Sequence, residues 1–445
     1  MPMTVALSWF ILFIFGSKLL MRILLIGGGG REHAMAWRMS QSPLCEALFI
    51  APGNAGTALC GENVDLDVLD FDKVAGFVTT NKLDMVVVGP EEPLVRGMGD
   101  YFAATPGLQN IMFVGPPSAG AMLEGSKAFA KAFMERHNIP TAAYRSFTED
   151  HLGEGLEYIR KIMPPYVLKA DGLAAGKGVV ISNSSEEAER TLTEMLQGKL
   201  FGEASKKVVV EEFLDGREMS VFVITDGKNY KMLPSAKDYK RVGEHDTGAN
   251  TGGMGTVSPV PFADDTLMGR VEEHIIKPTI NGLQEEGIPY CGFIFFGLMI
   301  VNGNPYVIEY NVRLGDPEAE AILPRIQSDF LELLHYCSTG RLKSFKVETL
   351  PQTALTLMLC SGGYPGAYEK GLEIIGLEKE SGQKLFYAGV KEQNGKYLTA
   401  GGRVIAITVL ASGIEEARTM AYDTASKIDF KGMYYRRDIG KDLLK

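Results

Sequence analysis

The chain of 445 residues has few cysteines and no excess of positive charge. Its five cysteines are scattered and never form a CxxC pair, so the sequence predicts neither a disulfide framework nor a zinc site. The formal net charge of −10 argues against a nucleic-acid-binding surface. Internal repeats and low-complexity segments are also missing. With 45% hydrophobic and 22% charged residues, the composition favours an ordinary globular protein with reduced thiols, as expected in the cytoplasm.

A hydrophobic segment long enough to cross a bilayer comfortably is also absent from the start of the chain. The apolar run Val5–Phe15 is too short, and Ser8 interrupts it. It lacks the preceding basic region and the following A-x-A-like cleavage site of a signal peptide. A clean strand begins only at Met21. We therefore expect residues 1–20 to be an extension outside the fold, with Met21 as the natural start; a peripheral membrane contact is the alternative.

The chain is longer than one hydrophobic core usually supports, so two to four domains are expected. Residues 21–122 show apolar runs alternating with amphipathic segments, which predicts βαβ units and an α/β domain built on a parallel sheet. Residues 123–320 predict a compact α+β unit at about 144–213, followed by an antiparallel sheet. A small α+β domain is expected over residues 351–445. The fold class is therefore α/β and α+β, with several domains.

Two elements are predicted between these units. The strand Ile294–Val301 is expected to pair with the strand Tyr306–Arg313 across the turn at 302–304. A single helix is expected over Pro324–Thr339.

The strand predicted over Tyr306–Arg313 places polar side chains on one face. Because side chains two residues apart share a face, Glu309, Asn311 and Arg313 are expected to project together. The alternate apolar residues of Ile308–Val312 are expected to point into the core. A carboxylate and an amide oxygen are donors that Mg²⁺ takes alongside nucleotide phosphates, and a guanidinium can pair with a carboxylate or phosphate. The alternative is an ordinary strand with a polar outer face.

Three glycine-containing turns follow strands of the predicted parallel sheet. Gly27–Gly30 opens a helix, so its backbone N–H groups can hold an anion. It matches the dinucleotide fingerprint GxGxxG poorly, because Glu32 takes the third glycine position, and a phosphate site is favoured. Turns containing Asn54 and Glu91 leave neighbouring strands at the carboxyl edge, where ligands of such sheets bind. Each could also be simple turn chemistry.

A lysine and a small-residue loop form the next candidate site. Lys169 ends a predicted strand, and the loop Ala170–Gly178 after it can fold over phosphates, although it is not a Walker loop. Further on, the segment Glu211–Glu218 leaves the compact unit and can present backbone groups to a base and an acid to ribose hydroxyls. A hairpin with solvated lysines and a plain acidic turn are the alternatives.

The segment Ser235–Thr256 combines a basic cluster with a long glycine-rich stretch. Lys237 and Arg241 lie in its first part, and Gly252, Gly253 and Met254 lie in its second. So long a loop inside a compact domain usually has a function, and this one suggests a lid over anionic ligands. A disordered linker is the alternative.

Together these features resemble the ATP-grasp fold, in which two α+β subdomains hold ATP between them. Within that fold the chain resembles the phosphoribosylamine–glycine ligase family of purine biosynthesis, from Met21 to about Gly440. The most specific motifs are Lys237–Met254 and Arg313–Glu318. The resemblance implies an N-terminal pre-ATP-grasp domain, a two-subdomain ATP-grasp core and a small C-terminal domain.

The resemblance also implies a reaction. Glycine and ATP would give glycyl phosphate and ADP, and the amine of 5-phosphoribosylamine would then displace phosphate to form glycinamide ribonucleotide. A divalent cation, Mg²⁺ or Mn²⁺, would assist, and the protein would be a monomer without nucleic-acid or membrane partners. Alignment and neutralisation of phosphate charge would carry the catalysis.

Residue roles follow from the same resemblance. The catalytic candidates are Arg313, Asp316, Lys237 and Arg241, with Arg313 and Asp316 on the carboxylate and amine of glycine. The cation ligands are Glu309 and Asn311. The ATP contacts are Lys127, Lys169, Gly176, Lys177, Gly178, Glu211, Glu212, Phe213, Leu214 and Glu218. The phosphoribosylamine site includes Gly28, Gly29, Gly30, Asn54, Glu91, Gly252, Gly253 and Met254.

Three alternatives remain at this point. Another ATP-grasp enzyme, such as a purine-pathway carboxylase or a biotin carboxylase, would not need the long Lys237–Met254 segment. A nicotinamide-dependent dehydrogenase would leave Lys169, Glu309 and Asn311 without a role. A non-catalytic nucleotide sensor would not need a phosphate-facing lid together with a metal pair.

Overall fold

The computed structural model describes residues 20–174, 178–377 and 383–444. The predicted extension at 1–20 therefore lies outside the described residues except for Leu20, and so do the predicted ATP contacts Gly176 and Lys177.

The N-terminal domain is built on a five-stranded parallel sheet, which confirms the prediction. Its strand order is β3-β2-β1-β4-β5, with β1 (Met21–Gly27), β2 (Cys45–Pro52), β3 (Glu62–Asn63), β4 (Met85–Val88) and β5 (Met112–Val114). Its helices are α2 (Gly30–Ser40), α3 (Phe71–Thr80), α4 (Glu91–Val95), α5 (Met98–Ala104) and α6 (Ser118–Gly125). Alternate residues of β1 enter two different cores, Ile23 and Leu25 in one and Leu24 and Ile26 in the other. Both faces of the sheet are thus covered, as is usual for parallel strands.

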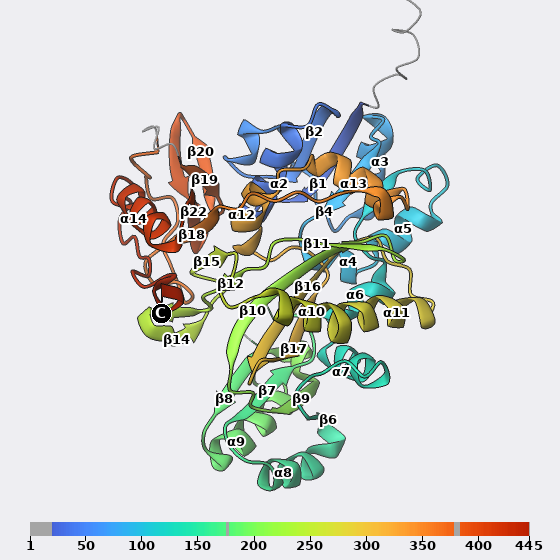
Figure 1. Ribbon diagram of the computed structural model, residues 1–445, viewed down its shortest axis with the longest axis vertical. Helices are drawn as coiled ribbons and strands as arrows, with labels where there is room; N and C mark the ends of the chain where they lie inside the picture. The colour runs from blue at the N-terminus through green and yellow to red at the C-terminus, as the bar shows by residue number, and fades with distance from the viewer. Residues whose placement is uncertain (1–19, 175–177, 378–382, 445) are drawn as a thin grey trace, which may run out of the picture.

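A compact α+β unit lies below this domain, at the bottom of the view in Figure 1. Its sheet has the order β6-β9-β7-β8, with β6 (Tyr144–Thr148), β7 (Tyr166–Ala170), β8 (Val179–Ser182) and β9 (Lys207–Glu212). The helices α8 (Leu152–Lys161) and α9 (Ser185–Leu196) cover one face and build a separate hydrophobic core. Strand β6 was not predicted from the sequence; it pairs along β9.

The long antiparallel sheet joins this unit to the N-terminal domain. Its order is β11-β10-β16-β17, with β10 (Arg217–Thr225), β11 (Tyr230–Met232), β16 (Gly292–Val301) and β17 (Asn304–Asn311). The predicted pairing of the last two strands is confirmed. The helices α7 (Lys127–Arg136), α10 (Asp265–Val271) and α11 (Lys277–Glu285) lie beside it (Figure 1).

Two details of β17 differ from the prediction. Gly297 pairs with Glu309 and Leu298 with Val307, so Ile308 is the extra residue of a β-bulge. Ile308 consequently lines a cavity instead of the core. The strand also ends at Asn311, two residues earlier than expected, because the next N–H, that of Val312, donates to the carboxylate of Glu124 (2.8 Å) rather than to a strand.

The prediction of a single helix over Pro324–Thr339 is wrong. The structure has α12 (Glu318–Ile322), a 3-10 turn at Leu323–Arg325 and a separate helix α13 (Phe330–Ser338). Asp329 starts the second helix because its carboxylate caps the N–H of Glu332 at 3.0 Å.

The sheet of the C-terminal unit includes two strands from the segment that was predicted to be a loop. Its five-stranded sheet has the order β12-β15-β18-β22-β19, with β12 (Lys237–Asp238), β15 (Gly255–Ser258), β18 (Thr353–Cys360), β19 (Lys384–Tyr387) and β22 (Arg403–Ala411). Two hairpins, β13 (Arg241–Gly243) with β14 (Thr247–Asn250) and β20 (Val390–Gln393) with β21 (Lys396–Thr399), and the helix α14 (Ile414–Ala425) complete the unit. The glycine-rich segment is therefore anchored by pairing to β18.

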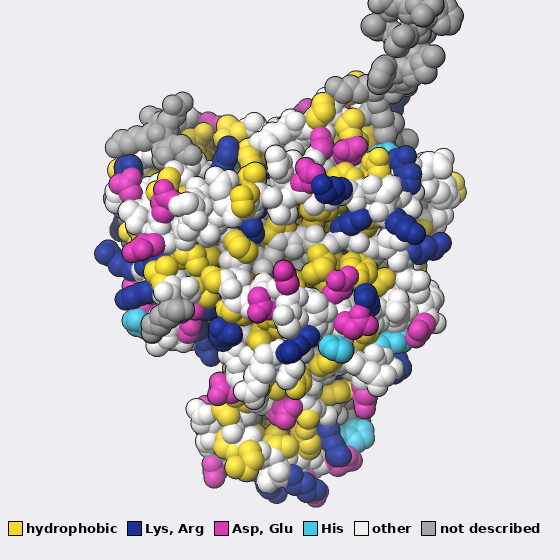
Figure 2. All heavy atoms as spheres, viewed as in Figure 1, with side chains coloured by type: hydrophobic (Ala, Val, Ile, Leu, Met, Phe, Trp, Pro, Cys, Tyr) yellow, Lys and Arg dark blue, Asp and Glu magenta, His cyan; other side chains and the backbone are white. Residues whose placement is uncertain are grey.

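Among the described residues, no helix is long and apolar enough to cross a membrane. On the face shown in Figure 2, acidic and basic side chains are interspersed.

Candidate functional site

A cavity of about 1030 Å³ lies where the compact unit, the long sheet, the N-terminal domain and the C-terminal unit meet. Most of the predicted site residues in the described part of the chain line it. They are Glu91, Lys127, Lys169, Gly178, Glu211, Glu212, Phe213, Leu214, Glu218, Lys237, Arg241, Gly252, Glu309, Asn311, Arg313 and Asp316. Segments far apart in sequence thus converge on one site.

Lys169 is fixed at one wall of the cavity. Its ammonium lies 3.0 Å from Glu211 Oε1 and donates to the carbonyl of Ile308 at 3.0 Å, so the bulge in β17 supplies the acceptor. Glu211 also pairs with Lys131, whose Nζ lies 3.0 Å from Oε2. Burial lowers the pKa of Lys131 to about 8 despite this partner. Two cations around one buried carboxylate leave this wall with a net positive charge for an anionic ligand.

Lys127 lies at the start of α7, which Ser126 and Asp171 hold against the compact unit. Ser126 Oγ donates to Asp171 Oδ1 at 2.9 Å, and the same carboxylate accepts from the N–H of Ala128 at 2.7 Å. Lys127 Nζ donates to the carbonyl of Gly172 at 3.4 Å. This places a second ammonium beside the loop that follows Lys169.

Glu309 faces a lysine that the sequence did not single out. Lys240 Nζ lies 3.1 Å from Glu309 Oε1 and 3.6 Å from Glu218 Oε2. The charge of Lys240 lowers the pKa of Glu309 to about 2. Burial would lower the pKa of Lys240, but Glu309, Glu218 and Asp238 outweigh it and hold that pKa well above its usual value. Both groups are therefore ionised at neutral pH.

Glu309 and Asn311 fit a divalent cation that also binds phosphate. Glu309 is ionised, Asn311 adds an amide oxygen, and both line the cavity. The described residues contain no cluster of three His, Cys, Asp or Glu side chains arranged for a metal. Such a pair matches Mg²⁺, which is usually held by one or two protein oxygens plus substrate phosphates and water.

Arg313 lies just past β17 and keeps one donor free. Its Nη2 lies 2.9 Å from Glu124 Oε1, and its Nη1 donates to the carbonyl of Leu314 at 3.2 Å. Among the described residues its buried Nε finds no hydrogen-bond partner, and Glu91 Oε2 lies 3.7 Å away. A buried donor without a partner is costly, so this position suits an anionic ligand group.

Asp316 is held between two arginines. Its Oδ1 lies 2.8 Å from Arg403 Nη2, and its carbonyl accepts from Arg403 Nη1 at 2.8 Å. Burial would raise the pKa of Asp316, but Arg403 and Arg31 lower it below its usual value. Asp316 therefore presents a negative charge to the cavity that Arg313 also lines.

The predicted phosphoribosylamine residues divide into two groups. Glu91 and Gly252 line the cavity, whereas Gly28, Gly29, Gly30, Asn54, Gly253 and Met254 do not. Asn54 fastens the turn, because its Nδ2 donates to the carbonyls of Gly28 (2.9 Å) and Tyr387 (2.6 Å). The side chain of Met254 is fully buried in the core. Their predicted roles in binding substrate stay predictions.

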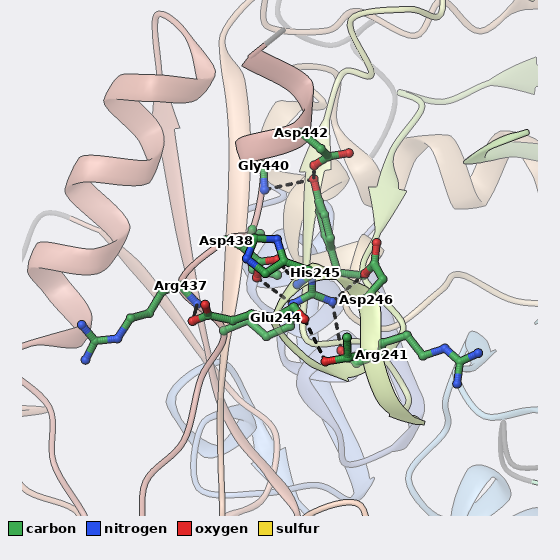
Figure 3. Close-up of polar contacts among 12 residues, drawn as sticks. Arg241, Glu244, His245, Asp246, Arg437, Asp438, Gly440 and Asp442 are labelled. Atoms are coloured by element: carbon green, nitrogen blue, oxygen red, sulfur yellow. Dashed lines mark hydrogen bonds and ion pairs between the residues drawn. The ribbon is translucent and has the colours of Figure 1, made fainter.

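Residues near the C-terminus form hydrogen bonds and ion pairs with the segment that carries Lys237 and Arg241 (Figure 3). Arg436 is 1% exposed; it donates to Asp438 (2.8 Å), to Asp246 (2.8 Å) and to the carbonyl of Arg241 (3.0 Å). Tyr239 donates to Asp442 at 2.6 Å, and Lys237 pairs with the same carboxylate. The segment predicted as a lid is thus tied to the end of the chain.

Replacing Arg436 by methionine should lower the free energy of unfolding by about 2 kcal/mol. The change removes the ion pairs of Asp438 and Asp246, although the N–H of His245 still donates to Asp438 (2.7 Å). The loss is smaller than for a fully buried pair because Asp246 is mostly exposed. Urea unfolding of the two proteins measures the difference. Arg437→Met at the exposed neighbouring position is the control, and an equal loss there would contradict the assignment.

Sequence reasoning missed several charged residues of the cavity. These are Arg31, Glu124, Lys131, Asp238, Lys240, Glu318 and Arg403. Glu318 ends the Arg313–Glu318 motif, and Asp238 and Lys240 stand within the basic cluster. The spacing of residues in the sequence did not distinguish these charged residues from their neighbours as site residues, because the groups that they pair with lie on other elements.

These features define an ATP-grasp protein: a compact α+β unit and a long antiparallel sheet enclose a cavity lined by lysines and by an ionised carboxylate. Comparison with protein-family models confirms the ATP-grasp class and identifies the family. The phosphoribosylglycinamide synthetase N domain matches residues 21–124, its ATP-grasp (A) domain matches 125–319, and its C domain matches 354–442. The chain belongs to the phosphoribosylglycinamide synthetase family.

Individual relatives agree. A phosphoribosylamine–glycine ligase of Pasteurella multocida is 48% identical over 424 residues, which is 94% of this chain and 97% of that protein. The crystal structure of a phosphoribosylamine–glycine ligase from Thermotoga maritima is 38% identical with a TM-score of 0.82, covering 94% of this chain and all of the other. The biotin carboxylase domain of Hydrogenobacter thermophilus 2-oxoglutarate carboxylase is 16% identical with a TM-score of 0.71, covering 93% and 92%, and shares only the fold.

Proposed function

We propose that the protein joins glycine to 5-phosphoribosylamine with ATP, giving glycinamide ribonucleotide, ADP and phosphate in purine biosynthesis. The observation that carries this is the family match over residues 21–319 and 354–442, combined with an ionised Glu309 and the Nε donor of Arg313 in one cavity. The domain division 21–122, 123–320 and 351–445, with the small subdomain at about 144–213, belongs to the same proposal.

The reaction proceeds in two displacements. A carboxylate oxygen of glycine attacks the γ-phosphorus of ATP, and the bond to the β–γ bridging oxygen breaks, giving glycyl phosphate and ADP. The amine of phosphoribosylamine then attacks the acyl carbon, phosphate leaves, and the new amide loses one proton. Phosphorylation is needed because a carboxylate oxygen is a poor leaving group.

The protein aligns the reactants and neutralises phosphate charge. Lys127 and Lys169 line the cavity and supply positive charge to the phosphate oxygens of ATP. Lys237 and Arg241 face the same cavity from the C-terminal side. Phe213 and Leu214 follow β9 at the cavity wall, where a base can lie, with Glu218 near the ribose. Arg313 holds the carboxylate of glycine and Asp316 its ammonium group.

Glu309 and Asn311 would hold a divalent cation, Mg²⁺ or Mn²⁺. When bound, the cation would offset the negative charge of the transferring phosphoryl group. The MgADP complex of the related biotin carboxylase domain supports a divalent cation in this fold. We further propose a cytoplasmic monomer without nucleic-acid or membrane partners.

Release of ADP tests the function. With freshly prepared phosphoribosylamine and MgATP, we expect ADP release that depends on glycine and not on bicarbonate. Activity with bicarbonate alone would instead favour a carboxylase, the second candidate that the shared fold permits. Mass spectrometry of the product separates glycinamide ribonucleotide from a carboxylated product.

A further inference from the structure

Glu320 in α12 is a fully buried carboxyl group behind the cavity wall. It is 0% exposed, and within the described chain neither of its carboxylate oxygens has a hydrogen-bond donor. An ionised carboxylate without donors in the interior costs several kcal/mol, so such a group binds a proton instead. Glu320 does not line the cavity, whereas Asp316, four residues before it, does.

The carboxyl groups of Asp316 and Glu320 are neighbours, because one lies against Gly29 and the other against Gly30, and each acts on the pKa of the other. In the part of the chain that the structure describes, Oδ1 of Asp316 also lacks a hydrogen-bond donor, although Arg403 Nη2 lies 2.8 Å away. With both acids ionised, two acceptors would meet without a hydrogen between them. One proton on Glu320 turns it into a donor, which removes its charge and gives Asp316 a hydrogen bond.

The pair lies against the N-terminal turn of α2. A Cβ atom on Gly30 would lie only 2.3 Å from Glu320 Oε1, and one on Gly29 would lie 3.3 Å from Asp316 Oδ2. Thr408 Oγ1 donates to the carbonyl of Glu320 at 3.0 Å and fixes its backbone from β22. The two glycines therefore leave the space in which the two carboxyl groups meet.

We propose that Glu320 is a protonated positioning residue, whose O–H donates to Asp316 and holds that carboxylate toward the ammonium group of glycine. The inference rests on the proposed function, because it assumes that Asp316 binds glycine. Glu320 acts through Asp316 and does not touch the substrate.

The surrounding charges are consistent with one proton on the pair. Burial, with Asp316 beside it, raises the pKa of Glu320 well above its usual value, whereas the arginines hold the pKa of Asp316 down. The titratable and charged groups around the pair come from α2, α4, β18, β22 and the loop after β18, and they are Arg31 with its partner Glu32, Glu91, Cys360, Arg403 and Tyr364.

Two substitutions test the role. Glutamine keeps a hydrogen-bond donor and cannot ionise, so Glu320→Gln should leave the KM for glycine at pH 7 within about twofold of wild type. Alanine removes the donor, so Glu320→Ala should raise that KM about tenfold with a smaller change in kcat. Steady-state ADP release at varied glycine concentrations measures both.

A pH profile gives the second readout. At alkaline pH, Glu320 in the wild type loses its proton, the two carboxylates repel, and the KM for glycine should rise more than in Glu320→Gln. Glycine's own ammonium group titrates equally in both proteins, so the difference between the profiles reports on Glu320. This comparison needs only the glutamine variant and decides the question even if Glu320→Ala does not fold.

Three results would overturn the inference: a Glu320→Gln variant as impaired at pH 7 as Glu320→Ala, a Glu320→Ala variant with the wild-type KM, or identical pH profiles. Each of these leaves the proposed function intact, because the wild type still shows glycine-dependent ADP release. A wild type without such release overturns the proposed function, and this inference with it.

Discussion

Replacing Glu309 by glutamine should lower kcat/KM for glycine-dependent ADP release about 10³-fold. Its pKa of about 2 means that it is a full negative charge at every working pH, and glutamine removes that charge from the proposed cation site. Loss of several kcal/mol of charge stabilisation corresponds to this factor. Steady-state kinetics measures it, and electron paramagnetic resonance of Mn²⁺ with ADP should show weaker binding.

Glu348→Gln is the matched control for this change. Glu348 is exposed and pairs with the likewise exposed Lys346 (2.8 Å), so its loss should leave turnover and Mn²⁺ affinity unchanged. Glycine-dependent turnover that survives Glu309→Gln at the wild-type rate would refute the assignment of Glu309 to the cation.

Replacing Arg313 by glutamine should raise the KM for glycine about 10²-fold while the KM for ATP changes little. The change removes the cation whose Nε is buried without a partner, and loss of a buried charge-assisted contact costs several kcal/mol. Initial rates with glycine and ATP varied separately distinguish the two constants.

Arg313→Lys serves as the control, because lysine keeps the charge without the planar fork. We expect an intermediate KM for glycine. Glutamine also leaves Glu124 without its ion pair, so unfolding of both variants should be compared by urea titration. A rise in the KM for ATP as large as that for glycine would show that Arg313 does not belong to the glycine site.

Local patterns in the sequence predicted much of the fold. The alternation of apolar runs predicted the parallel sheet around β1, and the predicted pairing of Ile294–Val301 with Tyr306–Arg313 matches β16 and β17. These signals are local, because neighbouring residues decide whether a strand or a helix forms. The single helix over Pro324–Thr339 failed for a local reason too, since the capping role of Asp329 was overlooked.

Long-range pairings could not be predicted in this way. The strands β12 and β15 join the C-terminal sheet through β18, about a hundred residues later in the chain, so the segment predicted as a lid is part of a domain. Lys240 became a site residue only when β17 brought Glu309 to it. Such contacts depend on how the sheets pack, and the spacing of residues along the sequence does not determine that packing.

The sequence by itself determined the types of residue at the site and the family they indicate, because motifs such as Glu309-x-Asn311 and Arg313–Glu318 lie in short segments. Only the tertiary structure decided which charges meet. It placed Ile308 on a bulge so that its carbonyl binds Lys169, gave Arg313 its partner Glu124, and buried Glu320 behind Asp316. The physical reason is that burial and charge pairing arise from packing between distant elements, and these set the protonation state of each group.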